Sequence, residues 1–237
     1  SSEVFGYPEA YYTPPTEAID KIELVRGAGA LQYGPQFGGL LNYVTKKNLG
    51  SKPITVESSQ TMGSYGMFNS FNAIGGKIKK FSYYAYMHHR GAQGWRENSQ
   101  YRTQTGSVSM SYDFSKKWQL TAAYTHMNYV SQQAGGLTDE QFATYPSRSS
   151  RARNWFSTPW NTANISLNFT PSVATRFTFK TFGIVAQRNS VGFMKGINIA
   201  DTINTDIAAY NPRQVDCDTY QNVGAELRGI HEYKLLG

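Results

Sequence analysis

The segment IDKIELVRGAGALQYGPQFGGLLNYVTKK, residues 19–47, holds two short apolar runs separated by a stretch rich in glycine. The runs IELVRG (22–27) and LLNYVT (40–45) each predict a short strand. Upstream, Pro14-Pro15-Thr16 predicts a short helical turn. Glycine adopts backbone conformations that other residues avoid, so this stretch also predicts tight turns and close approaches between backbones. The glycines concerned are Gly27, Gly29, Gly34, Gly38 and Gly39.

Downstream of about Lys52 the pattern changes to segments in which apolar and polar side chains alternate. In residues 162–170, Ala163, Ile165, Leu167 and Phe169 alternate with threonine, asparagine and serine. A period of two is typical of a strand with one apolar face. About eight such strands are predicted, close to the ~9–11 residues that a tilted membrane-crossing strand needs. The others are residues 54–62, 67–74, 81–90, 107–112, 118–124, 175–187 and 223–235.

The connections between these predicted strands alternate in length. Short ones lie at residues 75–80, 114–117 and 171–174, and long ones at residues 91–101, 131–160 and 188–221. Short turns at one end and long loops at the other are typical of outer-membrane β-barrels. A soluble β-sandwich shows the same alternation of side chains, so the choice of a barrel depends on the loop asymmetry and on the first 50 residues.

Composition excludes several classes of protein. The chain has 237 residues, of which 23 are Lys or Arg and 16 are Asp or Glu, so its formal net charge is +7. Only 16% of residues are charged and 14% are aromatic, whereas soluble domains average roughly 25% charged residues. A single cysteine, Cys217, excludes a disulfide within the chain, and no apolar run is long enough for a spanning helix.

No motif for catalysis, a cofactor or a metal ion is found. The sequence lacks a phosphate-binding Walker loop, a GxSxG elbow, an HExxH helix and a paired-carboxylate constellation, so we expect no enzyme. His88 and His89 are neighbours on a predicted strand and therefore point to opposite faces, which excludes a shared metal ion. Lysine pairs at 46–47, 79–80 and 116–117 are dispersed over predicted turns or their approaches, which argues against a nucleic-acid groove.

Residues 19–47 resemble the end of the plug domain of TonB-dependent outer-membrane receptors. That family follows I-E-[VL]-[VL]-R-G with a glycine-rich turn, Y-G, and then G-G-x-[IL]-N-[YI]-[VI]-T-[KR], and every block occurs here in order. Residues 54–66 also resemble the family's first barrel strand. The resemblance implies an all-β membrane barrel: a fragment of a 22-stranded antiparallel outer-membrane β-barrel with the C-terminal part of an α+β plug domain.

The resemblance also implies a division of the chain. Residues 1–50 would be the C-terminal part of the plug, and residues 51–237 the first eight or so strands of the barrel. The long extracellular loops would be residues 131–160 and 188–221. Because the chain starts at Ser1 and stops at Gly237 inside a predicted strand, we expect it to be an internal piece of a longer protein.

A narrower resemblance concerns the cargo. Residues 25–39, preceded by residues 6–15, are similar to receptors for ferric dicitrate, which implies that Gln36 contacts the ligand at the plug apex. The iron chelate would be a transported substrate, and no cofactor is implied. The implied partners are TonB, energised by ExbB/ExbD, through an N-terminal segment missing from this chain, together with outer-membrane lipid and lipopolysaccharide. Another siderophore, a non-iron nutrient, a passive porin and a β-rich adhesin stay open as alternatives.

Arginines in the two longest predicted loops are candidates for the anion site. Arg148, Arg151 and Arg153 lie close together in the first loop, and Arg213 lies in the second among several aspartates. A guanidinium group offers a planar pair of donors that matches a carboxylate, as a citrate-type chelate requires. The alternative is a loop that binds lipopolysaccharide phosphates or is simply solvated.

The resemblance also implies a role for a charged pair in the first apolar run. Glu23 and Arg26 would form part of the polar contact between plug and barrel wall. Such a pair is either structural or a switch for opening.

Overall fold

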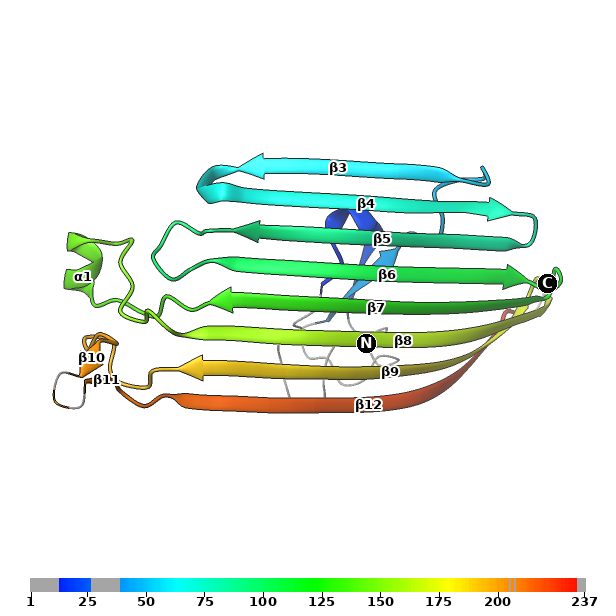
Figure 1. Cartoon of the computed structure of the whole chain (residues 1–237). Helices are drawn as coiled ribbons and strands as arrows, with labels where there is room; N and C mark the ends of the chain where they lie inside the picture. Colours follow the sequence, from blue (N-terminus) through cyan, green and yellow to red (C-terminus); the bar gives the residue numbers. More distant parts are fainter. Residues whose placement is uncertain (1–12, 27–38, 205, 207, 234–237) are drawn as a thin grey trace.

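The computed structural model describes residues 13–26, 39–204, 206 and 208–233 (Figure 1). A single 3₁₀ turn, η1 (Thr16–Ala18), follows Pro14 and Pro15, as the prolines predicted. Two strands then form an antiparallel pair, β1 (Ile19–Val25) and β2 (Leu40–Thr45). β2 coincides with its predicted run, and β1 begins three residues before its predicted run.

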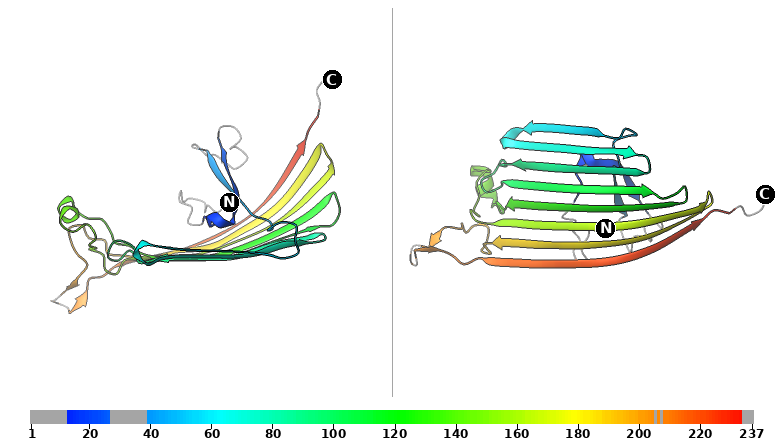
Figure 2. Two further views of the ribbon diagram at one scale, coloured as in Figure 1. Left: turned by 90° about the horizontal axis from the view of Figure 1, so that it is seen from above. Right: turned by 45° about the vertical axis from the view of Figure 1, so that its right-hand side comes forward.

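The rest of the chain forms one large sheet. Its strands are β3 (Thr55–Gly63), β4 (Met67–Ile78), β5 (Phe81–Ala92), β6 (Tyr101–Asp113), β7 (Trp118–Gln132), β8 (Trp155–Ser172), β9 (Thr175–Gly192) and β12 (Gln214–His231). They lie in the order β12-β9-β8-β7-β6-β5-β4-β3, and every pair is antiparallel. The sheet is curved, with the β1–β2 hairpin on its concave side (Figure 2). Eight antiparallel strands were predicted and eight are found.

Short elements lie in the connections at one end of the sheet (Figure 1). They are η3 (Ser64–Gly66), α1 (Asp139–Thr144) and the two-residue strands β10 (Ile203–Asn204) and β11 (Ala209–Tyr210). Thr138 caps α1 by accepting a hydrogen bond from Gln141 N–H, and the Gln141 side chain accepts one from Thr138 N–H. None of the helices among the described residues is long and apolar enough to cross a membrane.

Two long loops are shorter than predicted. The predicted loop 131–160 is reduced to residues 133–154, because β7 ends at Gln132 and β8 begins at Trp155. The predicted loop 188–221 is reduced to residues 193–213. In these strand ends polar side chains stand on both faces, so the alternation that reveals a strand is lost. The hydrogen-bonded register nevertheless continues to Gln132↔Trp155 and Val191↔Val215.

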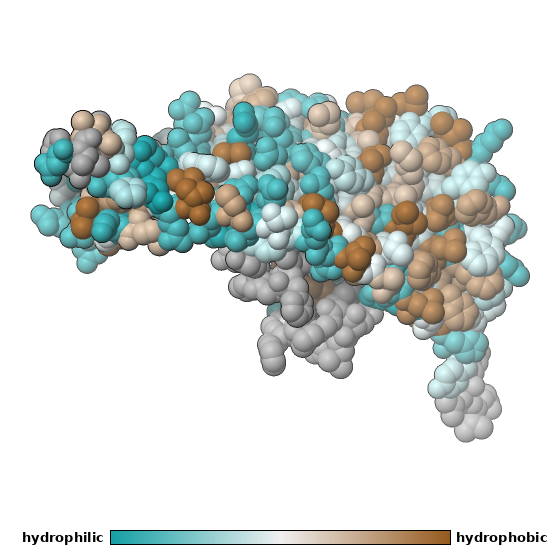
Figure 3. Space-filling model, turned by 60° about the horizontal axis from the view of Figure 1, so that its bottom comes forward, coloured by the Kyte–Doolittle hydropathy of each residue, from teal (hydrophilic) through white to brown (hydrophobic). Residues whose placement is uncertain are grey.

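The convex face changes from apolar to polar along the strands. Near the short turns one register row consists of large apolar side chains: Phe81, Tyr112, Leu120, Leu167, Phe179 and Leu227. Six residues further along, a parallel row mixes the polar His126, Asn161 and Gln221 with Met87, Gly106 and Val185, so it is less apolar than the first. Figure 3 shows apolar side chains gathered toward the short-turn end and hydrophilic ones toward the long loops. An apolar band with a polar extension fits strands that cross lipid and then protrude from it.

The linker between β2 and β3 turns around the short-turn edge of β4 at two adjacent glycines. Gly75 leaves room for the backbone of Leu49, and Gly76 for the carbonyl groups of Lys52 and Pro53. Lys77 N–H also donates to the Lys52 carbonyl at 2.9 Å. The linker therefore packs directly against β4 before the first long strand begins.

Candidate functional site

One register row of the concave face contains five buried side chains and three half-buried ones. It runs across the large sheet through Ser59, Phe71, His88, Thr105, Met127, Trp160, Ala186 and Tyr220. Phe71, Trp160 and Ala186 are at most 1% exposed. Met127, Trp160, Ile184 and Ala186 form one apolar cluster, with Tyr129 and Tyr220 packed against it. The row lies on the side of the sheet that faces β1 and β2.

The second apolar cluster joins the N-terminal segment to the sheet. Ala18 in η1 is buried together with Phe71, Tyr84 and Tyr86 of the large sheet, which is called the wall below. Leu49 of the linker packs against the same cluster. The phenol ring of Tyr86 lies 5.4 Å from the ring of Phe71. Burying an aromatic side chain stabilises such a contact by about 1.5–3 kcal/mol. This contact fixes η1 above β4 and β5.

Polar contacts tie the same segment to the wall. Lys46 Nζ, just after β2, lies 2.9 and 3.1 Å from the two carboxylate oxygens of Glu57 in β3. Further up the wall, Asn69 Nδ2 donates to Glu17 at 3.0 Å, and His88 Nε2 lies 2.6 Å from Asn69 Oδ1. These contacts show that Glu57, Asn69 and His88 face the concave side.

The carboxyl group of Glu17 is held in its ionised form. Burial raises its pKa, but hydrogen bonds from its own backbone N–H, from Asn69 and from Thr16 outweigh that effect. The pKa of Glu17 therefore lies below its ordinary value of 4.5. At neutral pH this end of the segment carries a charged hydrogen-bond acceptor directed at the wall.

Glu23 and Arg26, predicted to contact the wall, make no hydrogen bond or ion pair with the large sheet among the described residues. Glu23 accepts from Asn42 Nδ2 at 2.8 Å and pairs with Lys21 at 2.6 Å, both within the β1–β2 hairpin. The Lys21 hydrogen bond, the Asn42 hydrogen bond and the charge of Lys21 lower the pKa of Glu23. The wall contact of the pair stays a prediction, and the contacts that the structure does contain are those of Glu17, Ala18 and Lys46.

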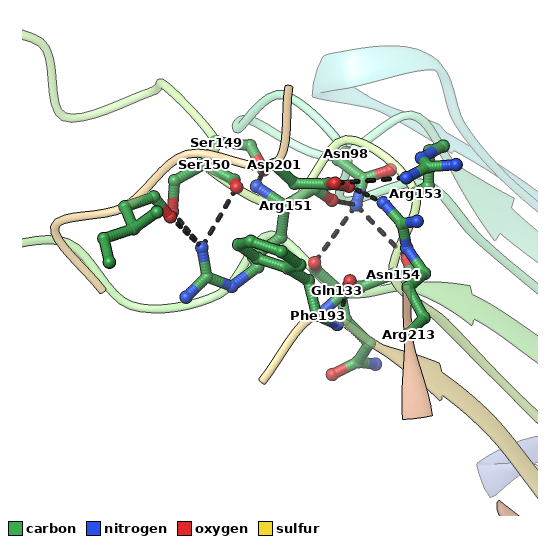
Figure 4. Close-up of polar contacts among 11 residues, drawn as sticks. Asn98, Gln133, Ser149, Ser150, Arg151, Arg153, Asn154, Phe193, Asp201 and Arg213 are labelled. Atoms are coloured by element: carbon green, nitrogen blue, oxygen red, sulfur yellow. Dashed lines mark hydrogen bonds and ion pairs between the residues drawn. The ribbon is translucent and has the colours of Figure 1, made fainter. Parts of the chain in front are cut away.

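Arg151 holds two long loops together (Figure 4). Its residue is 5% exposed, and its guanidinium group donates to the carbonyl oxygens of Ile199 at 2.7 Å, Lys195 at 2.6 Å and Gly196 at 3.1 Å. The guanidinium carbon also lies 5.2 Å from the ring centre of Phe193. All these partners belong to loop 193–213, so the cation of Arg151 serves as a clamp between loop 133–154 and loop 193–213.

Asp201 lies against two of the other predicted arginines, Arg153 and Arg213. Its carboxylate is fully buried, accepts a hydrogen bond from Arg153 Nη2 at 3.2 Å and forms an ion pair with Arg213. Arg153 also stacks over the ring of Tyr210 at 3.3 Å. Burial, followed by the charge of Arg153, lowers the pKa of Arg213, and the Asp201 carboxylate offsets this cost. The single negative charge of Asp201 is thus shared between Arg153 and Arg213, so the cluster keeps one net positive charge.

The loop 93–100 joins the same body. Arg96 donates to the carbonyl oxygens of Gly135 and Arg148, both at 2.9 Å. Asn98 Nδ2 donates to the carbonyl groups of Gln133, Arg151 and Asn154 (Figure 4). The three long loops are therefore preassembled into one hydrogen-bonded cap.

Two predicted ligand residues, Arg148 and Gln36, have not yet been placed. Arg148 is half-buried, and its side chain makes no hydrogen bond or ion pair with any described residue; only its backbone N–H and carbonyl groups are engaged. Gln36 lies outside the described residues. Of the predicted set, the structure therefore brings together Arg151, Arg153 and Arg213 through the loops, and leaves Arg148 as the available cation.

Sequence reasoning missed two cations of the concave face. Arg90 follows His88 by two residues on β5 and so shares its face, where it is exposed. Arg188 of β9 pairs with Asp218 at 3.3 Å and lies over Phe156 at 5.5 Å. The period of two along β5 could have revealed Arg90. Arg188 was hidden because residues 188–221 were assigned to a loop.

The described residues contain no group of three or more His, Cys, Asp or Glu side chains that could hold a metal ion. The concave face and the loops offer instead cations, aromatic rings and neutral hydrogen-bonding groups. Such a surface can bind an anion without covalent chemistry.

Comparison with known proteins agrees with this architecture. No family model matches the chain. Among solved structures, the ferric citrate transporter FecA in its unliganded form superimposes with a TM-score of 0.72 at 20% sequence identity, over 92% of this chain. The fold is that of a TonB-dependent outer-membrane receptor. The predicted fold class is thereby confirmed.

A second solved structure is more distant. A chain of the FpvAI–pyocin S2 complex matches with a TM-score of 0.51 at 12% identity, over 90% of this chain. In both comparisons this chain spans 32% of the solved chain, about a third of its length. In the receptor fold the concave side of the sheet is the inside of the barrel, so the row of Phe71 and Trp160 faces the barrel interior.

Proposed function

We propose that this chain belongs to a TonB-dependent outer-membrane receptor that imports a ferric chelate, with ferric dicitrate as the first candidate. The observation that carries the proposal is the position of η1, β1 and β2. They lie on the concave face of a sheet with the receptor fold, and their sequence resembles the end of a plug. A segment held on the concave side by contacts with β3, β4 and β5 would obstruct a passive pore, which argues against a porin.

We assign residues 1–50 to the plug and residues 51–237 to the first strands of the barrel wall. The linker that packs on Gly75 and Gly76 supports a boundary near residue 50, because β3 starts immediately after it at Thr55. The long loops 93–100, 133–154 and 193–213 would lie outside the cell, and the short turns would face the periplasm. The protein would reside in the bacterial outer membrane.

The cargo would be recognised by its negative charge. A citrate chelate of iron carries carboxylates, for which arginine supplies paired donors. Arg148 and Arg90 are two arginines of the described residues for which no side-chain hydrogen bond or ion pair is found, and Gln36 is added from the resemblance to ferric dicitrate receptors. In the closed cap, Arg151, Arg153 and Arg213 would contribute by holding the loops in shape.

Uptake would need mechanical work on the plug and no covalent step. TonB, energised by ExbB/ExbD, would pull on the plug from the periplasm. The contacts to be broken or passed over include Lys46–Glu57 and Glu17–Asn69, which are polar and half-exposed. Polar contacts of this kind cost little to separate. The apolar cluster around Ala18 and Phe71 would add to the work that TonB must supply.

Ligand binding to the purified full-length receptor tests the proposal. We expect ferric dicitrate to quench tryptophan fluorescence at lower concentration than a ferric hydroxamate or a ferric catecholate. Arg148→Ala, Arg90→Ala and Gln36→Ala should each weaken ferric dicitrate binding roughly tenfold, the usual effect of losing one charge-assisted hydrogen bond. Arg102→Ala, on the convex face, is the matched control.

Two results would overturn parts of this assignment. If a hydroxamate or catecholate chelate binds more tightly than ferric dicitrate, the receptor function stands and the cargo is wrong. If the protein conducts ions steadily in planar bilayers without TonB, the porin alternative replaces the receptor.

A further inference from the structure

The short-turn edge of the sheet carries a concentration of lysines. Lys79 and Lys80 form the β4–β5 turn, Lys116 and Lys117 lie in the β6–β7 turn, and Arg176 follows the β8–β9 turn. All five are exposed. By contrast, the basic residues of the three long loops are arginines, except for Lys195.

These cations lack acidic partners. The described residues place Lys46 against Glu57 and Lys77 against Asp113, at 2.9 and 3.8 Å. No ion pair joins Lys79, Lys80, Lys116, Lys117 or Arg176 to a carboxylate of the described residues. The turn lysines therefore present uncompensated positive charge along one edge.

The conformation of Lys79 is a separate indication. Its φ is 54°, in the left-handed region where glycine or asparagine is the usual choice. A lysine at this position costs backbone stability without improving the turn. Lys80 Nζ reaches the next turn and donates to the Phe114 carbonyl at 3.0 Å. The local geometry alone therefore does not account for lysine at position 79.

Aromatic side chains on the convex face stand beside these turns. Trp118 stacks on Phe169 with ring centres 4.2 Å apart, and Tyr112 meets Phe114 edge-on at 5.1 Å. Both pairs lie at the short-turn end of the apolar band. Aromatic rings at that depth sit at the boundary between acyl chains and headgroups, where lysine side chains reach the headgroup phosphates.

A polar hollow of about 340 Å³ lies at the same edge. Lys47, Lys116, Lys117 and Arg176 line it with Trp118, and Asp113 is the one acidic residue among its lining residues. Lys47 comes from the end of the N-terminal segment. The other lining residues come from turns and strand ends of the large sheet. By strand register, Asp113, Gln119, Asn168 and Arg176 lie on the concave face. The hollow therefore opens toward the inside of the curved sheet, and the lipid-facing part of the edge consists of the turn lysines and the aromatic band.

We propose that this basic edge binds anionic phospholipid headgroups, such as phosphatidylglycerol, in the leaflet that faces the short turns. The proposal rests on the membrane location given under the proposed function and is independent of the cargo. An acidic segment of a periplasmic protein could also be attracted by lysines. The lipid is favoured because the cations are spread over successive turns along the sheet edge, directly beside the aromatic band.

Lipid retention by the full-length receptor tests the proposal. Detergent-solubilised receptor is mixed with equal amounts of phosphatidylglycerol and zwitterionic phosphatidylethanolamine, and the bound lipids are counted by native mass spectrometry. We expect a preference for phosphatidylglycerol that falls about tenfold or more in K116Q/K117Q, since each basic residue near an anionic surface contributes roughly fivefold. K116R/K117R should keep the preference, which separates loss of charge from misfolding.

The control variant removes two positive charges from the long-loop end of the sheet. R102Q/K195Q changes two exposed cations at the long-loop end and should leave the preference intact. Equal lipid preference in K116Q/K117Q and in the unmodified receptor would overturn the proposal, as would displacement of the lipid by millimolar inorganic phosphate alone. Loss of ferric chelate binding with an intact lipid preference would refute the cargo and leave this inference standing. A protein that stays soluble without detergent would refute the membrane function itself.

Discussion

Lys46 and Glu57 form a two-pronged ion pair between the end of the β1–β2 hairpin and the first strand of the wall, at 2.9 and 3.1 Å. Only ten residues separate them in sequence, yet the chain passes around the edge of β4 between them. The pair fixes where the N-terminal segment leaves the concave face. It is therefore the first contact to examine in the attachment of the segment to the wall.

The Lys46–Glu57 pair should show measurable coupling. Because the two side chains are 25% and 35% exposed, we expect a coupling free energy of about 0.5–1 kcal/mol in a double-mutant cycle of K46Q and E57Q. Amide hydrogen exchange of residues 39–50 in the full-length receptor provides the readout. Lys21→Gln, whose partner Glu23 lies in the same hairpin, is the control; strictly additive effects of K46Q and E57Q would refute the coupling.

Removing Arg151 should release the loop cap. Arg151→Ala leaves the carbonyl groups of Ile199, Lys195 and Gly196 without their donor, and we expect a loss of about 2–3 kcal/mol of local stability. Chymotrypsin should then cleave loops 133–154 and 193–213 several-fold faster, while the sheet stays folded. Arg148→Ala should leave cleavage unchanged, because no described residue bonds to its side chain. Unchanged cleavage in Arg151→Ala would contradict the clamp.

Attachment of η1 should depend on pH through Glu17. The folded-state pKa of Glu17 is lowered below 4.5, so its stabilising effect is complete above that pH and is lost as pH falls through the lowered value. Hydrogen exchange of residues 13–26, corrected for its intrinsic pH dependence, should therefore accelerate only below pH 4.5. His88 faces the same site through Asn69. Glu17→Gln should abolish the acid-dependent change; a wild-type protein without that change would contradict this assignment.

The glycine at position 76 should be intolerant of a side chain. A Cβ there would lie 2.2 Å from the Pro53 carbonyl oxygen, so the linker would have to move. We expect Gly76→Ala to destabilise the receptor by about 1–3 kcal/mol in thermal unfolding. Gly106→Ala is the matched control, since nothing lies within 4 Å of its Cβ and it also sits inside a strand. Equal effects of the two substitutions would show that linker packing is unimportant.

The large sheet was predictable because its alternation of side chains follows directly from strand geometry. Residues 162–170 alternate without exception, and β8 contains them. The prediction was wrong at the strand ends: Ser157 and Asn161 are polar on the convex face, which removes the contrast between the faces. Hydrogen bonds between strands persist where that contrast vanishes, and no pattern in one strand reveals its neighbour.

The candidate site was less predictable than the fold. Arg151 and Arg153 were singled out because arginine suits carboxylates, but carbonyl groups and Asp201 occupy their donors. Only the approach of two loops, a long-range event, decides whether such a cation is free. Glu57 was equally hidden, although it is the single carboxylate in β3 and needs a partner on the covered face.

The central claim is that residues 13–26 and 39–50 lie inside a barrel whose wall begins at β3. Cross-linking tests it most directly in the full-length receptor with Cys217 replaced by serine. A short thiol-to-thiol reagent should join K46C to E57C rapidly, and should fail to join K46C to S58C, whose side chain points to the convex face. Equal cross-linking of both pairs, or preference for position 58, would place the hairpin outside the wall and contradict the account.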